Sequence, residues 1–104
     1  MAITSTLVAD SATTVYTSTN NSAITWLSFT NYGGATVTIS VNIVPNGGSA
    51  SDTNIIVDEL EIASKDTYQW YAGGEKILLE DDDFVSALSN TASSISCTVS
   101  YTAI

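Results

Sequence analysis

The sequence predicts an all-β fold, namely an antiparallel two-sheet β-sandwich, jelly-roll-like, with about eight short strands. Segment 35–44 (ATVTISVNIV) alternates β-branched apolar residues with Thr, Ser and Asn, the pattern of a strand buried on one face. Thr, Ser, Val and Ile are abundant while Leu, Met, Lys, Arg and Gln are scarce, so β formers replace helix formers. Turn residues recur about every 8 to 12 residues, as in sandwiches and barrels.

A chain of 104 residues has the size of one domain and can bury a core without metals or disulfides. We expect residues 1–12 to form an N-terminal arm or an edge strand, and residues 13–104 to form a single sandwich domain. The first residues show no basic segment and no apolar run of signal-peptide length. No stretch approaches the roughly 18 apolar residues of a membrane helix.

Four strands are expected in the first half of the chain, at 13–18, 23–31, 35–44 and 53–62. Segment 23–31 is apolar on both faces, so we expect a bend between Trp26 and Leu27 that changes its buried side. The glycines after Tyr32 predict a hairpin that pairs 23–31 with 35–44. Segment 45–52 (PNGGSASD) predicts a mobile, exposed loop, and the acids of 53–62 are typical of an edge strand.

Four more strands are expected in the second half, at 67–71, 76–80, 84–89 and 94–104. Within 67–71, Tyr68 and Trp70 share one face and are expected in the core, whereas Tyr71 lies on the other face. Segment 94–104 alternates as strictly as 35–44. We therefore expect these two strands to contribute to the same core.

The charge balance excludes some classes of partner. Lys65 and Lys76 are the only basic residues against eleven acids, and the net charge is −9. Because phosphate backbones and anionic lipids are bound by clustered Lys and Arg, we expect no free nucleic acid and no membrane as partner. A charge of this size keeps the unbound protein soluble.

We expect no catalytic residue and no cofactor, so the protein is predicted not to be an enzyme. The chain has no His, the usual proton carrier near neutral pH, and its acids lie in turns and along a polar edge rather than in a buried site. Cys97 is the only cysteine, so no intramolecular disulfide can form. We expect Cys97 to be a small buried apolar residue.

The sequence offers two weak binding candidates. Four consecutive acids can supply oxygen ligands to Ca²⁺, namely Glu80, Asp81, Asp82 and Asp83. Consecutive side chains point in different directions, and a solvated turn is the alternative. Tyr71 is a candidate for stacking on a glycan, with core or interface packing as the alternative. Otherwise we expect a binding surface in the N-terminal arm and in the loop 45–52.

Several stretches follow one another in a recognisable order: Val15-Tyr16-Thr17, the strand within 31–44, DELEIASKDTYQW at 58–70, and EKILLEDDDFVSALSNTASSISCTVSYTAI at 75–104. This order resembles small β-sandwich virion structural proteins of tailed bacteriophages. In that family a VTVxVxxV strand precedes a Gly-rich loop, an IPAGxT turn, an xIVLEAGDxLxxxAS stretch and a terminal xVxVSYxEI.

The resemblance covers residues 13–104. Segment 62–67 stands for the first turn of the family pattern, 77–85 for the next stretch, and 96–104 for the ending. The chain departs from the pattern at Ala63-Ser64 and at Asp81-Asp82, where the family has Ala-Gly.

The resemblance implies a non-enzymatic part of the virion, located on the capsid exterior or on the tail. The leading interpretation is a capsid decoration or cement protein, whose partners are the major capsid protein and copies of itself. The alternatives are a neck, tail or fibre-attached module of the virion, or a carbohydrate-binding module that recognises host glycans.

Overall fold

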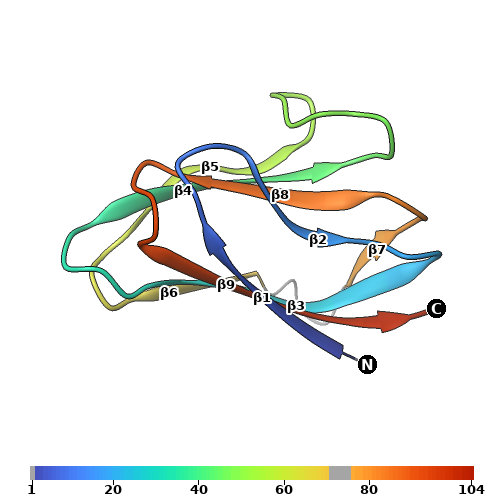
Figure 1. The fold of residues 1–104 in the computed structure, drawn as a ribbon, viewed down its shortest axis with the longest axis horizontal. Helices are drawn as coiled ribbons and strands as arrows, with labels where there is room; N and C mark the ends of the chain where they lie inside the picture. Colours follow the sequence, from blue (N-terminus) through green and yellow to red (C-terminus); the bar gives the residue numbers. More distant parts are fainter. Residues whose placement is uncertain (1, 71–75) are drawn as a thin grey trace.

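The computed structural model describes residues 2–70 and 76–104, and in them two antiparallel sheets pack face to face (Figure 1). Sheet A has the strand order β1 (Ala2–Val8), β9 (Ile95–Ala103), β3 (Ser22–Asn31) and β6 (Thr67–Trp70), and β7 (Ile77–Leu79) also pairs with β3. Sheet B has the order β2 (Thr13–Thr17), β8 (Phe84–Ser89), β4 (Val37–Val44) and β5 (Ile55–Ile62). The predicted all-β sandwich is confirmed. The described residues form nine strands rather than about eight, because Ala2–Val8 is an edge strand.

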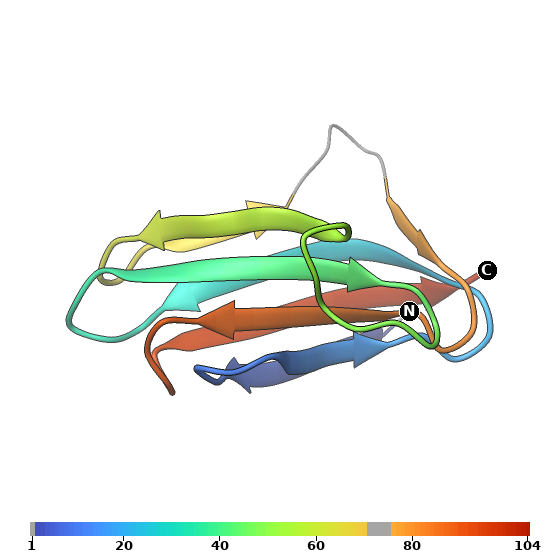
Figure 2. The same cartoon turned by 90° about the horizontal axis from the view of Figure 1, so that it is seen from above.

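The strand pairs nest inside one another along the chain: β4 pairs with β5, β3 with β6, β2 with β8, and β1 with β9. A long antiparallel hairpin that rolls up on itself produces this nesting, and the resulting strand order is that of a jelly roll. Rolling places β5 and β6 along one long side of the molecule and β1 and β2 along the other, as Figure 2 shows.

The hairpin predicted between 23–31 and 35–44 is wrong. Strand β3 lies in sheet A and β4 in sheet B, where β4 pairs with β5 and β8. The cause is Asn31, a fully buried side chain at the end of β3. Its Nδ2 donates to the carbonyl oxygens of Ala35 (2.8 Å), which lies just before β4, and of Ile62 (2.9 Å), the last residue of β5. These hydrogen bonds hold the chain where it crosses from one sheet to the other.

The bend predicted in β3 exists, but at a different position. The register of β3 with β9 shifts between Ile24 and Trp26, so the bulge lies at Thr25 and not between Trp26 and Leu27. The Oγ1 of Thr25 donates to the carbonyl oxygen of Ser100 (3.1 Å). A polar residue thus occupies the unpaired position, and the buried side changes from Ile24 to Leu27 across it.

The core fills the space between the sheets. Its largest fully buried apolar side chains come from three strands and are Phe29, Leu27, Ile39 and Ile95. As predicted, β4 and β9 both contribute to it, from opposite sheets. The alternation of β4 fails near its end, where Val41 and Asn42 are both buried and the register with β5 shifts. The described residues include no helix of the length and hydropathy that crossing a membrane requires.

Candidate functional site

The outer face of sheet A is an uncharged surface rich in hydroxyl groups. Because alternate residues of a strand point to opposite faces, its side chains stand in cross-strand rows that the register defines. The rows consist of Ile3, Ser100 and Trp26; of Ser5, Thr98, Ser28 and Gln69; and of Leu7, Ser96, Thr30 and Thr67. We call these residues the hydroxyl face.

Large exposed apolar side chains lie among the hydroxyl groups of the hydroxyl face. Ile3 is 71% exposed, Leu7 is 54% exposed and Trp26 is 36% exposed. Ile3 and Trp26 flank Ser100 in the same row, since both are paired with it. A surface with an exposed Trp, apolar neighbours and no charge has the composition of the core of a protein interface, which is depleted in charged residues and enriched in aromatic ones.

The charges of the protein lie elsewhere. Within the described residues, no strand of sheet A contains a charged residue. The only charged residues inside a described strand are Asp58, Glu59 and Glu61, all on β5. Strand β5 lies at the edge of sheet B, so the prediction that segment 53–62 forms an acidic edge strand is confirmed. The charged residues that the structure describes therefore lie on β5 and in connecting segments, and none of them belongs to the hydroxyl face.

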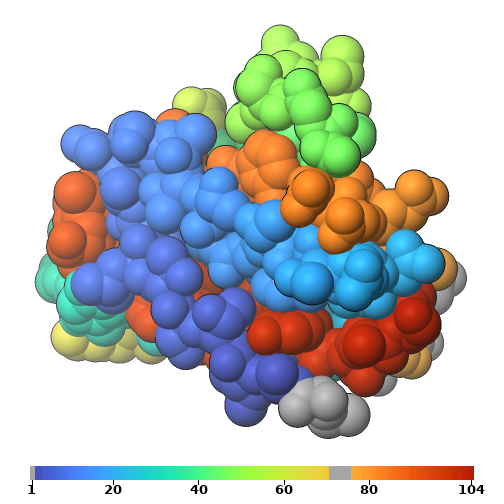
Figure 3. Space-filling view, turned by 45° about the vertical axis from the view of Figure 1, so that its right-hand side comes forward, coloured from blue at the N-terminus to red at the C-terminus, as the bar shows by residue number. Residues whose placement is uncertain are grey.

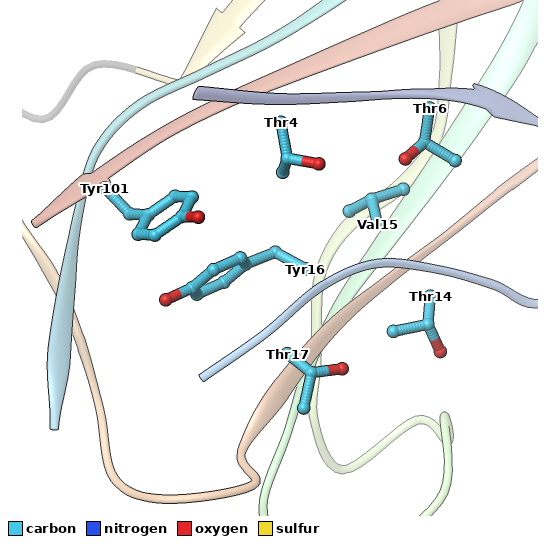
Figure 4. Close-up of a pocket in the computed structure, with 7 residues that line it drawn as sticks. All are labelled: Thr4, Thr6, Thr14, Val15, Tyr16, Thr17 and Tyr101. Atoms are coloured by element: carbon cyan, nitrogen blue, oxygen red, sulfur yellow. The ribbon is translucent and has the colours of Figure 1, made fainter. Parts of the chain in front are cut away.

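A cleft opens between β1 and β2, the neighbouring edge strands of the two sheets (Figure 4). Its volume is about 360 Å³, and it is lined by Thr4, Thr6, Thr14, Val15, Tyr16, Thr17 and Tyr101. A bulge between Thr14 and Tyr16 buries both Val15 and Tyr16. The ring of Tyr16 lies against that of Tyr101, with centroids 4.4 Å apart. The lining is uncharged, so the cleft suits a neutral group that carries hydroxyls or apolar carbon.

A chain of hydroxyl groups fixes the position of Tyr16. The Tyr16 hydroxyl donates to the Oγ of Ser22 (2.8 Å), and the Oγ of Ser18 donates to the carbonyl oxygen of Asn20 (2.9 Å). The hydrogen bond to Asn20 uses the only hydrogen on the Ser18 Oγ. Ser22 is therefore the donor in the 2.6 Å contact between the Oγ atoms of Ser22 and Ser18. The oxygen of Tyr16 therefore keeps acceptor capacity.

The acidic segment 80–83 forms a turn in which its carboxylates accept backbone hydrogen bonds. Asp81 accepts from the N–H of Asn20 (2.7 Å). Asp83 accepts from the N–H groups of Asn46 (2.8 Å) and Glu80 (2.9 Å). Asp82 has a φ of 64°, in the left-handed backbone region that favours glycine. The acids thus tie the turn to two neighbouring loops.

The Ca²⁺ candidate at Glu80–Asp83 receives no support from further ligands. Across residues 2–70 and 76–104, no group of three or more His, Cys, Asp or Glu side chains is placed to hold a metal ion. The glycan candidate Tyr71 lies outside the described residues. Its neighbours Tyr68 and Trp70 are half-buried and pack against the core, as predicted.

The loop between β4 and β5 is exposed, as predicted, and projects from the body of the molecule (Figure 3). Its base is anchored. The Nδ2 of the buried Asn42 donates to the carbonyl oxygen of Ser51 (2.9 Å) and to the Oδ1 of Asn54 (2.8 Å). The side chain that interrupts the alternation of β4 therefore holds the loop in place.

Cys97 is fully buried between the sheets, as predicted. Burial raises the pKa of its thiol to about 12, because the thiolate would lose its hydration. A thiol with such a pKa is not a nucleophile at neutral pH.

Sequence reasoning did not find the hydroxyl face. Two signals for it were present: the strict Ser/Thr alternation of β9 and the absence of charge from every strand assigned here to sheet A. Neither signal is sufficient until the register shows that β1, β9, β3 and β6 are neighbours.

Comparisons with known proteins identify no relative: no family model matches the chain, and no curated protein or solved structure is significantly similar to it.

Proposed function

We propose that this chain is a non-enzymatic structural protein of a bacteriophage virion. In the leading form of the proposal it is a capsid decoration or cement protein that binds between major capsid subunits and stabilises the head. The observation that carries the proposal is the hydroxyl face, an uncharged sheet surface on a protein of net charge −9.

The separation of charge from this face suits a protein that is soluble alone and docks on a large surface. Burying a charge in an interface is costly unless the charge is paired, so a face without charges can be desolvated at low cost. The acids on β5 and in the loops remain in water and prevent non-specific association of the unbound protein. We propose the major capsid protein as the partner of this surface because the sequence resembles phage virion proteins.

The jelly-roll strand order is compatible with this function but does not select it. Viral capsid domains and lectins both use this fold, and a fold by itself does not determine a function. The lack of His and the burial of the only Cys support a non-enzymatic role.

Replacing Trp26 by lysine tests the docking face. Purified Trp26→Lys is expected to rebind virions stripped of this protein at least about tenfold more weakly than the wild type, because the lysine places a charge in the apolar part of the hydroxyl face. The matched control is Leu88→Lys on sheet B, whose side chain is 39% exposed against 36% for Trp26. Quantifying the bound copies and the thermal stability of the refilled heads gives the readout. Equal rebinding of both variants would remove the hydroxyl face from the proposal.

The alternative within the virion is a neck, tail or fibre-attached module, which can use the same face. Copy number separates the two, because cement proteins cover the whole head whereas neck and tail parts are few.

A second candidate function, carbohydrate binding, is favoured by the cleft between β1 and β2. The rings of Tyr16 and Tyr101, which lie tilted against each other, and the threonine hydroxyls offer apolar rings and hydrogen-bonding groups without charge. Binding to a glycan array that is lost in Tyr101→Ala would favour this function, and an array without signal would count against it.

A further inference from the structure

The free edge of β1 has no feature that protects it from pairing with another strand. Natural edge strands are protected by charges, prolines or bulges. Strand β5 has three acids and a bulge at which Glu59 takes a φ of 47°, and β2 has a bulge at Val15. Strand β1 (AITSTLV) has no charge and no proline, and its register with β9 is continuous from Ala2 to Val8.

The sequence of β1 is complementary to itself in the antiparallel direction. If two copies pair with Ser5 opposite Ser5, then Ile3 lies opposite Leu7 and Thr4 lies opposite Thr6. Ile3 and Leu7 are on the outer face in each copy, and Thr4 and Thr6 are on the inner face. Each residue therefore meets a chemically similar one on its own face, and such apolar and Thr–Thr pairs stabilise sheets.

We propose that two copies of this chain pair through β1 around a twofold axis at Ser5, which joins their A sheets into one continuous sheet. A twofold axis makes the contact isologous, as in most homodimers. The seven residues of β1 bring no like charges together, although each copy carries a net charge of −9. The twofold axis also joins the two hydroxyl faces into one larger uncharged surface.

The cleft between β1 and β2 gives the partner strand room. Thr4 and Thr6 of β1 line this cleft of about 360 Å³, so the side chains that a partner strand adds on the inner face have open space beside β1. Figure 3 shows β1 and β2 uncovered on the same side of the molecule. Ile3 and Leu7, exposed in the monomer, cover each other across the twofold axis.

Charge substitutions at Ser5 test this pairing. Because Ser5 meets its own copy at the axis, Ser5→Lys and Ser5→Glu each place like charges directly opposite one another, and each variant is expected to be monomeric. An equimolar mixture of the two is expected to recover the dimer. Light scattering after size-exclusion chromatography measures the mass from about 1 µM to about 1 mM, a range that covers weak edge contacts. The control Gln69→Lys, on the opposite edge of sheet A, is expected to dimerise as the wild type does.

A disulfide cross-link tests the register. Ser5→Cys is expected to form a disulfide dimer on mild oxidation, because directly opposite residues of an antiparallel pair have Cβ atoms about 4.5–5.5 Å apart. The only native cysteine, Cys97, is fully buried and does not interfere. Ser11→Cys, exposed in the β1–β2 turn, is expected to cross-link far more slowly.

Hydrogen exchange of the unmodified protein avoids any effect of the substitutions on folding. Amides of β1 are expected to gain protection as the concentration rises, while those of β5 do not change. A wild-type chain that stays monomeric up to about 1 mM, or a mixture of Ser5→Lys and Ser5→Glu that stays monomeric, would overturn the proposal. Protection of β1 that appears only when virions are added would also overturn it, since the partner strand would then belong to another protein.

The inference deepens the proposed function, because it names the contact between copies of this chain, but its test is separate. A dimer that forms through β1 and does not bind stripped virions would contradict the capsid role and leave the pairing intact. Virion binding by a wild-type chain that stays monomeric in solution up to about 1 mM would contradict the pairing and leave the capsid role intact.

Discussion

Replacing Asn31 by aspartate is expected to lower the free energy of unfolding by about 3–5 kcal/mol at pH 7. The Asn31 side chain makes four hydrogen bonds: its Nδ2 donates to two carbonyl oxygens, and its Oδ1 accepts from the N–H of Gly33 (3.0 Å) and the Oγ of Ser94 (3.1 Å). Aspartate has the same shape but no donor. Its carboxylate would face the carbonyls of Ala35 and Ile62 in a site from which water is excluded.

Urea denaturation followed by Trp fluorescence measures this loss. Asn21→Asp makes the same chemical change at an exposed position and is expected to alter the free energy of unfolding by less than about 0.5 kcal/mol. If Asn31→Asp lowered the free energy of unfolding by less than about 1 kcal/mol, the hydrogen bonds of Asn31 would not be what holds the chain where it crosses between the sheets.

The stability of the protein is expected to fall above about pH 9 because of Cys97. Burial raises the pKa of this thiol from its ordinary value of 9.0 to about 12 in the folded state. Between these two values the unfolded chain loses the thiol proton while the folded chain keeps it. The contribution of Cys97 to stability is therefore fully present below pH 9 and declines by about 1.4 kcal/mol for each pH unit up to about pH 12.

The comparison variant is Cys97→Ala, which lacks the titrating group. Removing the sulfur costs stability by a similar amount at every pH, so the change with pH in the difference between the two curves isolates the thiol. The two free energies of unfolding are expected to converge as the pH rises from 9 to 11. Parallel curves would contradict the burial of Cys97. At pH 8 the folded protein is expected to resist thiol reagents that label the unfolded chain.

The fold class could be predicted from the sequence because it depends on local alternation, which 35–44 and 94–104 display clearly. The pairing of β3 and β4 could not, because Gly33 and Gly34 indicate a turn but not its direction. That direction is set by Asn31, which binds carbonyls as far along the chain as Ile62. A contact of this range leaves no local pattern.

The candidate site was predictable only in its parts. The alternation of Ser and Thr in 94–104 indicates a polar strand face, and Trp26 places a large aromatic side chain on the predicted strand 23–31. That they share one uncharged face with Ile3 follows from the pairing of β9 with both β1 and β3, and from the bulge at Thr25 that turns Trp26 outward. For the N-terminal segment the sequence leaves an arm and an edge strand as alternatives, and the edge strand is confirmed. In the structure this segment is β1, and its proposed contact is the free edge of the strand.

A cryo-electron microscopy reconstruction of the virion is the decisive test of the capsid decoration role. We expect density for this chain in many copies on the outer surface of the head, between major capsid subunits, with sheet A against the capsid and β5 and its acids toward solvent. Density found only at the neck or tail would contradict the decoration role. Density on the head with sheet B against the capsid would contradict the hydroxyl face as the docking surface.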